Sequence, residues 1–287
     1  MTTYISAAEA LAVVQSGNRV FVHGGAATPL HLLRSLQEQR NRLENVELTS
    51  VSMQGEPIIT EADRGHFFIN SLFVSPAVRK LVNTGMGDYI PVFLSEIPKL
   101  FRQGYLKIDV ALIQVSPPDR HGFCTLGVSV DVVHAALESA KYIIAQVNPK
   151  MPRTHGDSAV HKSVFTAMVL HEEELPQLSY ATDESDEVSK LIGAYCASII
   201  EDGATLQMGI GSIPDAVLKC LTNHRHLGVH TEMFSDGIIP LVESGVIDGS
   251  KKKIMPGKIV TGFLVGTQKL YDFVHDNPSV AVRDIDF

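Results

Sequence analysis

Residues 17–29 read GNRVFVHGGAATP, and residues 203–214 read GATLQMGIGSIP. Each stretch runs from a glycine through a short apolar strand into a glycine-containing turn and then a proline. A helix with leucines follows in both, and a second strand comes next, at Val46–Val51 and at Gly228–Thr231. Any α/β protein repeats such units by construction, but the shared order and spacing favour two related units built on one template.

Short apolar, β-rich runs alternate with helical stretches along the sequence, which is typical of an α/β fold with a mainly parallel sheet. The predicted strands are Arg19–His23, Val46–Val51, Phe67–Ser71, Val92–Leu94, Val110–Val115, Tyr142–Val147, Thr205–Met208, Gly228–Thr231 and Lys258–Phe263. The predicted helices are Ala7–Gln15, Pro29–Gln39, Ser75–Val82, Glu96–Gln103, Ser129–Ala140, Asp186–Ile200, Pro214–Leu221 and Ile238–Ser244.

The polar stretch Tyr180–Glu187, with the sequence YATDESDE, has few apolar residues and is expected to connect two domains. The predicted domains are residues 1–185 and residues 186–287. Ser185 or Asp186 could cap the helix that follows, because both side chains accept hydrogen bonds from the first helical amides.

The composition excludes several classes of protein. Hydrophobic residues make up 45% and charged residues 20%, and the formal net charge of −8 opposes nucleic-acid binding, which needs a basic face. The three cysteines are far apart and odd in number, which fits a reducing cytoplasm rather than a disulfide framework. Neither a signal peptide nor an apolar run of about 20 residues is visible, so we expect a cytoplasmic protein without membrane contact.

The glycine turn from Gln207 to Pro214 is a candidate ligand site. It follows a predicted strand and opens a helix, where free backbone amides can bind a phosphate or a developing oxyanion. Gly209 and Gly211 let the backbone approach a ligand closely, and Pro214 suits the first helical position. Pro214 also takes the place of the third glycine of a dinucleotide-binding fingerprint, which disfavours a nicotinamide-dependent enzyme. A plain tight turn is the structural alternative.

Glu232 lies in the segment His230–Gly237, with the sequence HTEMFSDG, directly after the next predicted strand. Ligands of open α/β sheets bind at the carboxyl ends of the strands, so the glycine turn and Glu232 should lie at one edge of one sheet. A carboxylate there can act as a general base or as a covalent nucleophile. From the residues alone, an exposed or capping glutamate is the simpler interpretation.

A third segment, Ser116–Gly127, follows the predicted strand Val110–Val115. Its prolines and glycines predict a fixed loop at the end of that strand. Asp119, Arg120 and His121 could form a second cluster at the active edge. The alternative is a structural loop held by an Asp119–Arg120 pair or by bonds from Asp119 to the backbone.

In this order the motifs resemble the acetyl-CoA hydrolase/transferase family, a group of class I CoA-transferases, and within it most closely the 4-hydroxybutyrate and butyryl-CoA:acetate CoA-transferases. The segments that carry the resemblance are Val22–Ala26 with Pro29, Ser116–Gly122, Gln207–Ala216, His230–Gly237 and Pro256–Val260. The resemblance implies two similar open α/β domains, often with the active site completed across a dimer. Family members are much longer, so the second domain is expected to be incomplete.

The resemblance also implies the chemistry. Glu232 takes the place of the family's nucleophile, and Gln207, Gly209, Ile210 and Gly211 fall on the turn that lines the acyl-CoA site. We expect a CoA-transferase that exchanges CoA between a short-chain acyl-CoA and a carboxylate such as acetate by ping-pong kinetics. The acyl group could be 4-hydroxybutyryl, butyryl or acetyl. The expected assembly is a homodimer or a higher homo-oligomer, with coenzyme A as a substrate and no permanently bound metal or cofactor.

Two alternatives stay open at this point. The same site could use water as the acceptor, which would make the protein an acyl-CoA hydrolase. The chain could also bind CoA without catalysing a reaction.

Overall fold

The structure is a computed structural model that describes residues 3–178 and 187–287. The chain divides into two compact units. Unit 1 comprises Met1–Arg153, Ser158–Pro176 and Asp284–Phe287, and unit 2 comprises Thr154–Asp157 and Gln177–Arg283. The predicted domain boundary between residues 185 and 186, the predicted cap and most of the connection Tyr180–Glu187 lie outside the described residues.

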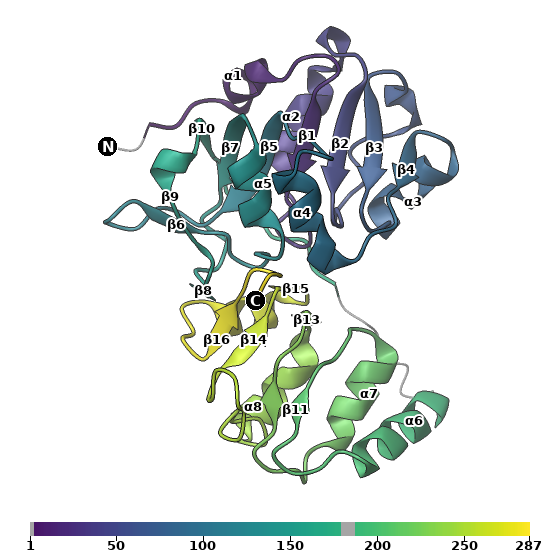
Figure 1. Ribbon diagram of the computed structural model, residues 1–287, viewed down its shortest axis with the longest axis vertical. Helices are drawn as coiled ribbons and strands as arrows, with labels where there is room; N and C mark the ends of the chain where they lie inside the picture. The colour runs from purple at the N-terminus through teal and green to yellow at the C-terminus, as the bar shows by residue number, and fades with distance from the viewer. Residues whose placement is uncertain (1–2, 179–186) are drawn as a thin grey trace. The chain divides into compact units, whose positions relative to one another are not determined.

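Unit 1 is built on one parallel sheet (Figure 1) with the strand order β10-β7-β5-β1-β2-β3-β4. The strands are β1 (Arg19–Val22), β2 (Val46–Ser50), β3 (Phe67–Ser71), β4 (Gly87–Tyr89), β5 (Val110–Val115), β7 (Tyr142–Val147) and β10 (Ala167–Leu170). The chain builds the sheet outward from β1 to β4 and then continues on the other side of β1 with β5. The boundary between β1 and β5 is therefore the topological switch point, where open α/β sheets form a crevice.

Helices cover both faces of this sheet (Figure 1), so its central strands are apolar on both sides. Val20 and Val22 of β1 pack on the face that carries α1 (Ala7–Ala10), α2 (Leu30–Glu38) and α3 (Pro76–Asn83). Phe21 points to the opposite face and meets Phe101 of α4 (Ile97–Arg102), with ring centroids 5.6 Å apart. Helix α5 (Val133–Ser139) packs beside α4.

The other strands are short. In unit 1, β6 (Phe123–Thr125) forms an antiparallel pair with β9 (Ala159–His161). In unit 2, all pairs are parallel: β11 (Thr205–Leu206) with β12 (Gly228–Val229), β13 (Met233–Phe234) with β15 (Phe263–Leu264), and the set β14 (Ile259–Thr261), β16 (Val280–Val282) and β8 (His155–Gly156). A bridge between His230 and Val260 links the β11–β12 pair to β14.

The helices of unit 2 are α6 (Glu187–Ser198), α7 (Ser212–Cys220), α8 (Ile239–Glu243) and α9 (Gln268–Val274). Short 3₁₀ helices in the two units span Leu11–Val13, Arg40–Arg42, Glu61–Asp63, Leu94–Glu96, Lys162–Val164 and Asp236–Ile238. No helix in the described part of the chain is both long enough and apolar enough to cross a membrane.

The two βα units predicted from the sequence share detailed backbone geometry. Gly17 and Gly203 both have a positive φ, of 75° and 78°. Each donates its N–H to a carbonyl shortly before the next strand, Glu44 at 2.9 Å and Arg225 at 2.8 Å. A residue in the left-handed region follows directly in both copies, Asn45 with φ 53° and His226 with φ 56°. The second strand then pairs in parallel with the first in each unit.

The α/β class and the parallel sheets are confirmed, and several predicted elements differ in detail. Val92–Leu94 is not a strand, because Pro91 removes a backbone donor and a 3₁₀ helix begins at Leu94. Helix α5 begins at Val133 rather than Ser129, after Asp131 has adopted a positive φ of 26°. The strands β4, β6, β8, β9, β10, β13 and β16 and the helix α9 were not predicted.

Helix α6 contacts α7 through a face of small residues, Ser189, Gly193 and Ala197. A β-carbon on Gly193 would lie 2.7 Å from the carbonyl oxygen of Ala216, so the two helices approach as closely as only glycine allows.

We predict that Gly193→Ala lowers the free energy of unfolding by about 1–2 kcal/mol, because the added methyl group overpacks the helix contact. Helix propensity alone would instead raise the free energy of unfolding by about 1 kcal/mol, because alanine favours a helix more than glycine does. Denaturant unfolding measures the change. The control is Ala194→Gly on the exposed side of α6, which loses only the propensity difference. A more stable Gly193→Ala protein would contradict the close contact.

Candidate active site

Glu232 lies where β12 has ended and β13 has not begun, and its backbone is firmly held. Its carbonyl oxygen accepts hydrogen bonds from the N–H of Gly262 at 2.9 Å and the N–H of Phe263 at 3.1 Å, and the hydroxyl of Thr261 lies 3.1 Å from it. A β-carbon on Gly262 would lie 3.3 Å from this oxygen. The peptide of Glu232 is thus anchored to the segment between β14 and β15.

The Glu232 side chain, unlike its backbone, is not held by hydrogen bonds to the described residues. It is exposed, and within the described residues its carboxylate has no hydrogen-bonding or ionic partner. Nearby protein atoms still remove part of its hydration, and this desolvation raises the pKa of the carboxyl above its ordinary value. An unpaired carboxylate with a raised pKa is more basic and less hydrated than an ordinary surface glutamate, which suits a base or a nucleophile.

The glycine turn leaves β11 at the same sheet edge, because β11 and β12 run parallel in the register Thr205↔Gly228 and Leu206↔Val229. Beyond the strands, the backbone N–H of Met208 donates to the Thr231 hydroxyl at 3.0 Å. Met208 follows Gln207 and Thr231 precedes Glu232, so the structure brings the predicted turn and the predicted carboxylate to neighbouring positions.

The turn opens helix α7 with free backbone donors. Gly211 is the N-cap with φ 121°, a conformation that favours glycine, and the first helical bond runs from Asp215 N–H to the Gly211 carbonyl at 3.1 Å. Among the described residues, the amides of Ser212 and Ile213 have no acceptor. Pro214 occupies the third helical position, not the first as predicted, and its missing N–H still falls within the unpaired first turn.

The predicted turn residues are accessible to a ligand. Gln207 and Gly209 are exposed, and Ile210 and Gly211 are partly exposed. The turn therefore presents side chains and amides to solvent on the same edge as Glu232.

Two carboxylates that the sequence interpretation did not single out hold the segment after Glu232. Asp236 accepts hydrogen bonds from the Thr267 N–H at 2.9 Å and from the Thr267 hydroxyl at 2.5 Å, which ties this segment to the start of α9. Asp215 of α7 accepts from the Ser235 hydroxyl at 3.4 Å, and burial raises the pKa of this carboxyl. The HTEMFSDG motif is thus anchored on the C-terminal side of the glutamate.

The loop Ser116–Gly127 has the structural role that was the alternative in the sequence analysis. Asp119 accepts hydrogen bonds from the backbone N–H of His121 at 2.8 Å and of Phe123 at 2.9 Å, and it faces Arg153 rather than Arg120. This loop belongs to unit 1 and leads into β6, which pairs antiparallel with β9. Asp119 therefore holds the turn through its bonds to the backbone.

A network of buried polar side chains fills the switch point of unit 1, at the boundary between β1 and β5. Gln114 of β5 and Gln146 of β7 are paired in register, and their side chains hydrogen-bond at 3.1 Å. Gln146 also donates to the Glu173 carboxylate at 2.6 Å, and that carboxylate accepts the N–H of His31 at the start of α2 at 3.2 Å. A glutamine at the same position of two apolar strands was the sequence signal that could have revealed this network.

His23 completes the network and is held neutral. Its Nδ1 accepts the backbone N–H of Gln114 at 3.2 Å, so its Nε2 carries the proton and donates to the Ser129 carbonyl at 2.8 Å. Burial lowers the pKa of His23 to about 4. The histidine is therefore a structural group at neutral pH.

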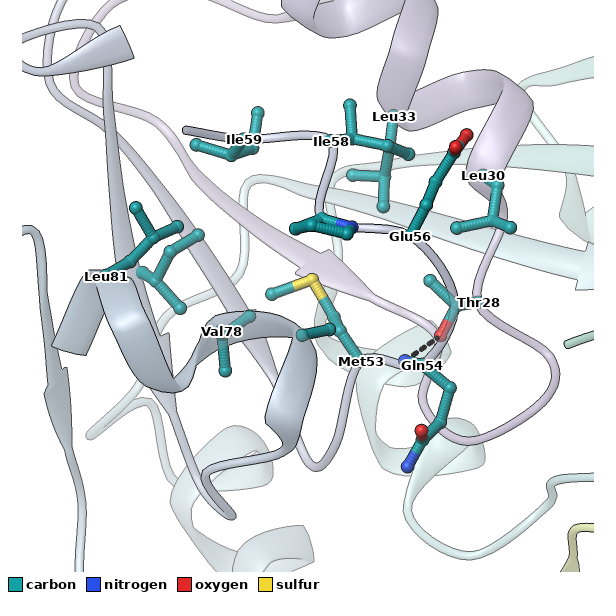
Figure 2. A pocket seen from close by; sticks show the side chains of 13 residues that line it. Thr28, Leu30, Leu33, Met53, Gln54, Glu56, Ile58, Ile59, Val78 and Leu81 are labelled. Carbon is teal, nitrogen blue, oxygen red and sulfur yellow. Dashed lines mark hydrogen bonds between the residues drawn. The ribbon is translucent and has the colours of Figure 1, made fainter. Parts of the chain in front are cut away.

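Unit 1 also contains a mainly apolar pocket of about 330 Å³, including its open mouth. Figure 2 shows Leu30 and Leu33 of α2 facing Val78 and Leu81 of α3, with Met53 between the two helices. The dashed line in Figure 2 is the bond from Gln54 N–H to the Thr28 hydroxyl at 3.0 Å, which fixes the pocket's polar end. The remaining lining residues are Glu56, Pro57, Ile58, Ile59, Ile69 and Ala77. No predicted site residue lines it.

Within residues 3–178 and 187–287, no group of three or more His, Cys, Asp or Glu side chains is placed to hold a metal ion. The arrangement that the structure provides is instead a partly desolvated carboxylate beside open backbone amides at the carboxyl edge of a parallel α/β sheet.

The fold and the motifs together place the chain in one protein family. The chain belongs to the acetyl-CoA hydrolase/transferase family, whose N-terminal domain profile matches residues 2–178. The family resemblance is thereby confirmed.

Among curated relatives, the chain is 46% identical over 281 residues to the succinyl-CoA:acetate/propanoyl-CoA:succinate CoA transferase of Fasciola hepatica, covering 96% of this chain and 58% of that protein. It is 45% identical to the 4-hydroxybutyrate coenzyme A transferase of Clostridium kluyveri, covering 99% of this chain and 66% of that protein. The crystal structure of 4-hydroxybutyrate CoA-transferase from Porphyromonas gingivalis matches with a TM-score of 0.84 at 35% identity, over 99% of this chain and 68% of that one. The chain thus spans 58–66% of the length of these two curated relatives.

We predict that Glu232→Gln raises the thermal stability of the protein at pH 7. The pKa of Glu232 is higher in the folded protein than its ordinary value of 4.5, so the folded state holds the proton more tightly. Stability therefore falls as the pH rises from 4.5 through the raised pKa, and the neutral glutamine removes that penalty. Thermal unfolding at several pH values should show a small gain at pH 7 that disappears below pH 4.

The matched control is Glu243→Gln, which removes one negative charge from an exposed position on α8. An equal gain from both substitutions would show that net charge, rather than local desolvation of Glu232, is responsible.

Proposed function

We propose that this chain is the nucleophile-bearing part of a CoA-transferase, in which Glu232 accepts CoA from a short-chain acyl-CoA and passes it to a carboxylate. The observation that carries the proposal is the exposed, unpaired and partly desolvated Glu232 carboxylate on a rigidly held peptide beside the glycine turn. The names of the relatives, all CoA transferases, agree with this reaction class.

The first half of the reaction transfers CoA to the protein. A carboxylate oxygen of Glu232 attacks the thioester carbonyl, and the tetrahedral intermediate expels CoA thiolate to leave an acyl-glutamyl anhydride. The thiolate then attacks the glutamyl carbonyl of the anhydride. This step releases the donor's carboxylate and leaves CoA on Glu232 as a thioester.

The second half reverses these steps with a different acid. The acceptor carboxylate attacks the glutamyl-CoA thioester, which gives a new mixed anhydride and CoA thiolate. The thiolate then attacks the acceptor's acyl carbonyl, which forms the new acyl-CoA and restores the Glu232 carboxylate. Each half consumes one substrate and releases one product, so ping-pong kinetics follow.

The open amides at the start of α7 suit the negative charge that develops on the carbonyl oxygens. The amides of Ser212 and Ile213 are the candidates for this role. We propose that the preceding turn residues Gln207, Gly209, Ile210 and Gly211 bind the acyl-CoA. A well-placed backbone donor contributes roughly 3–4 kcal/mol to transition-state stabilisation in comparable sites. In unit 1, the corresponding start of α2 is already bonded to Glu173, which leaves that helix unsuited to the role.

Acyl-CoA and short-chain carboxylates are the substrates, with 4-hydroxybutyryl, butyryl and acetyl groups as candidates, and coenzyme A is a substrate rather than a resident cofactor. The protein is proposed to act in the cytoplasm as a homodimer or higher oligomer. All three cysteines are free, which fits a reducing compartment.

We predict that Glu232→Ala, made in the full-length protein, lowers CoA transfer by at least about 10³-fold, because it removes the nucleophile. Transfer from butyryl-CoA to acetate measures this, and borohydride reduction followed by mass spectrometry detects the glutamyl-CoA thioester. Glu243→Ala is the control and should keep full activity. Transfer by Glu232→Ala at the wild-type rate would refute the assignment.

The nearest rival function, acyl-CoA hydrolysis, uses the same intermediate with water as the acceptor. The ratio of acetyl-CoA formed to free CoA released separates the two, and we expect transfer to dominate when acetate is present. A protein that binds acyl-CoA but forms no trapped thioester would instead be a binding module.

A further inference from the structure

Thr231 carries a buried hydroxyl group next to Glu232. The residue is 4% exposed, and its hydroxyl oxygen accepts the N–H of Met208 at 3.0 Å. Its single proton can go to the Met208 carbonyl at 2.7 Å or to the Met233 carbonyl at 3.0 Å. The Thr231 hydroxyl therefore links the residue before Glu232 to the glycine turn. It also lies within hydrogen-bonding distance of the residue after Glu232.

The Thr231 hydroxyl links the two segments beyond the point where β11 and β12 end. The last backbone bond between the two strands runs from His230 N–H to the Leu206 carbonyl at 3.0 Å. In the described chain, the Thr231 hydroxyl makes the next link between the segments, at Met208. The separation between the turn and Glu232 is thus set by a side chain rather than by the β ladder.

Thr261 repeats the arrangement at the end of β14 and provides an internal comparison. Its hydroxyl, in a residue that is 1% exposed, lies 3.1 Å from the Glu232 carbonyl and 2.7 Å from the Phe263 carbonyl. The Glu232 carbonyl also accepts two backbone N–H groups, from Gly262 and Phe263. Loss of the Thr261 hydroxyl therefore leaves that peptide held, whereas loss of the Thr231 hydroxyl removes the acceptor of the Met208 N–H.

We infer that Thr231 is a positioning residue for the proposed reaction, which sets the Glu232 carboxylate relative to the amides of the glycine turn. The inference rests on the proposed function. Glu232 must attack the same thioester whose oxyanion the turn would hold, and a displacement of about 1 Å can lower such a rate about 100-fold. The chemical step should therefore depend on the Thr231 hydroxyl more than substrate binding does.

The test compares three substitutions in the full-length protein. Thr231→Val keeps the shape and removes the hydroxyl, Thr231→Ser keeps the hydroxyl, and Thr261→Val is the matched control for a buried threonine at a strand end. The measurements are kcat and KM for transfer from butyryl-CoA to acetate, the single-turnover rate of glutamyl-CoA thioester formation, and the thermal midpoint.

We expect Thr231→Val to lower kcat and the rate of thioester formation by about 30–100-fold, with KM for butyryl-CoA changed by less than about threefold. Thr231→Ser should recover both rates to within about fivefold of the wild type. Thr261→Val should stay within about fivefold of the wild type even if its thermal midpoint falls as far as that of Thr231→Val.

Three results would overturn the inference: wild-type thioester formation by Thr231→Val, a serine variant as slow as the valine variant, or an equal loss in Thr261→Val. If Thr231→Val does not fold, Thr231→Ala compared with Thr231→Ser gives the same test of the hydroxyl. Failure of the proposed function looks different, because the wild-type protein itself would then form no glutamyl-CoA thioester.

Discussion

The parallel pairing of β11 with β12 is the constraint on which the candidate site depends. It brings the ends of both strands to one edge, so that the glycine turn and Glu232 become neighbours. The ladder is only two residue pairs long, and it cannot order the chain beyond Val229 by itself. The buried hydroxyl group of Thr231 continues the connection where the backbone ladder stops.

Two glutamates show how the same fold treats a carboxylate in opposite ways. In unit 1, Glu173 accepts bonds from Gln146, from the N–H of His31 and from Arg34 at 3.1 Å, so its charge is neutralised and its orientation is fixed. In unit 2, the Glu232 carboxylate has none of these partners among the described residues, although its own carbonyl accepts two backbone N–H groups. The backbone of Glu232 is rigidly held while its carboxylate has no partner among the described residues, and this combination favours reactivity over stability.

The repeated βα template explains why the two units can differ in this way. In unit 1, β1 lies between β2 and β5. The strands β5 and β7 place Gln114 and Gln146 at the switch point, where their hydrogen-bonded side chains fill it. In the described part of unit 2, β11 has β12 as its one neighbour, and the amides that begin α7 stay open. The same local structure is therefore a closed structural network in one unit and an accessible edge in the other.

The sequence by itself determined the long strands Val110–Val115 and Tyr142–Val147, because a strand buried on both faces needs a nearly continuous apolar run. It also determined the order of glycine turn and glutamate along the chain. Only the tertiary structure decided that Asp119 holds a turn and that the Thr231 hydroxyl meets Met208. That bond joins residues 23 positions apart, and such a contact exists only after two strands have paired in one register.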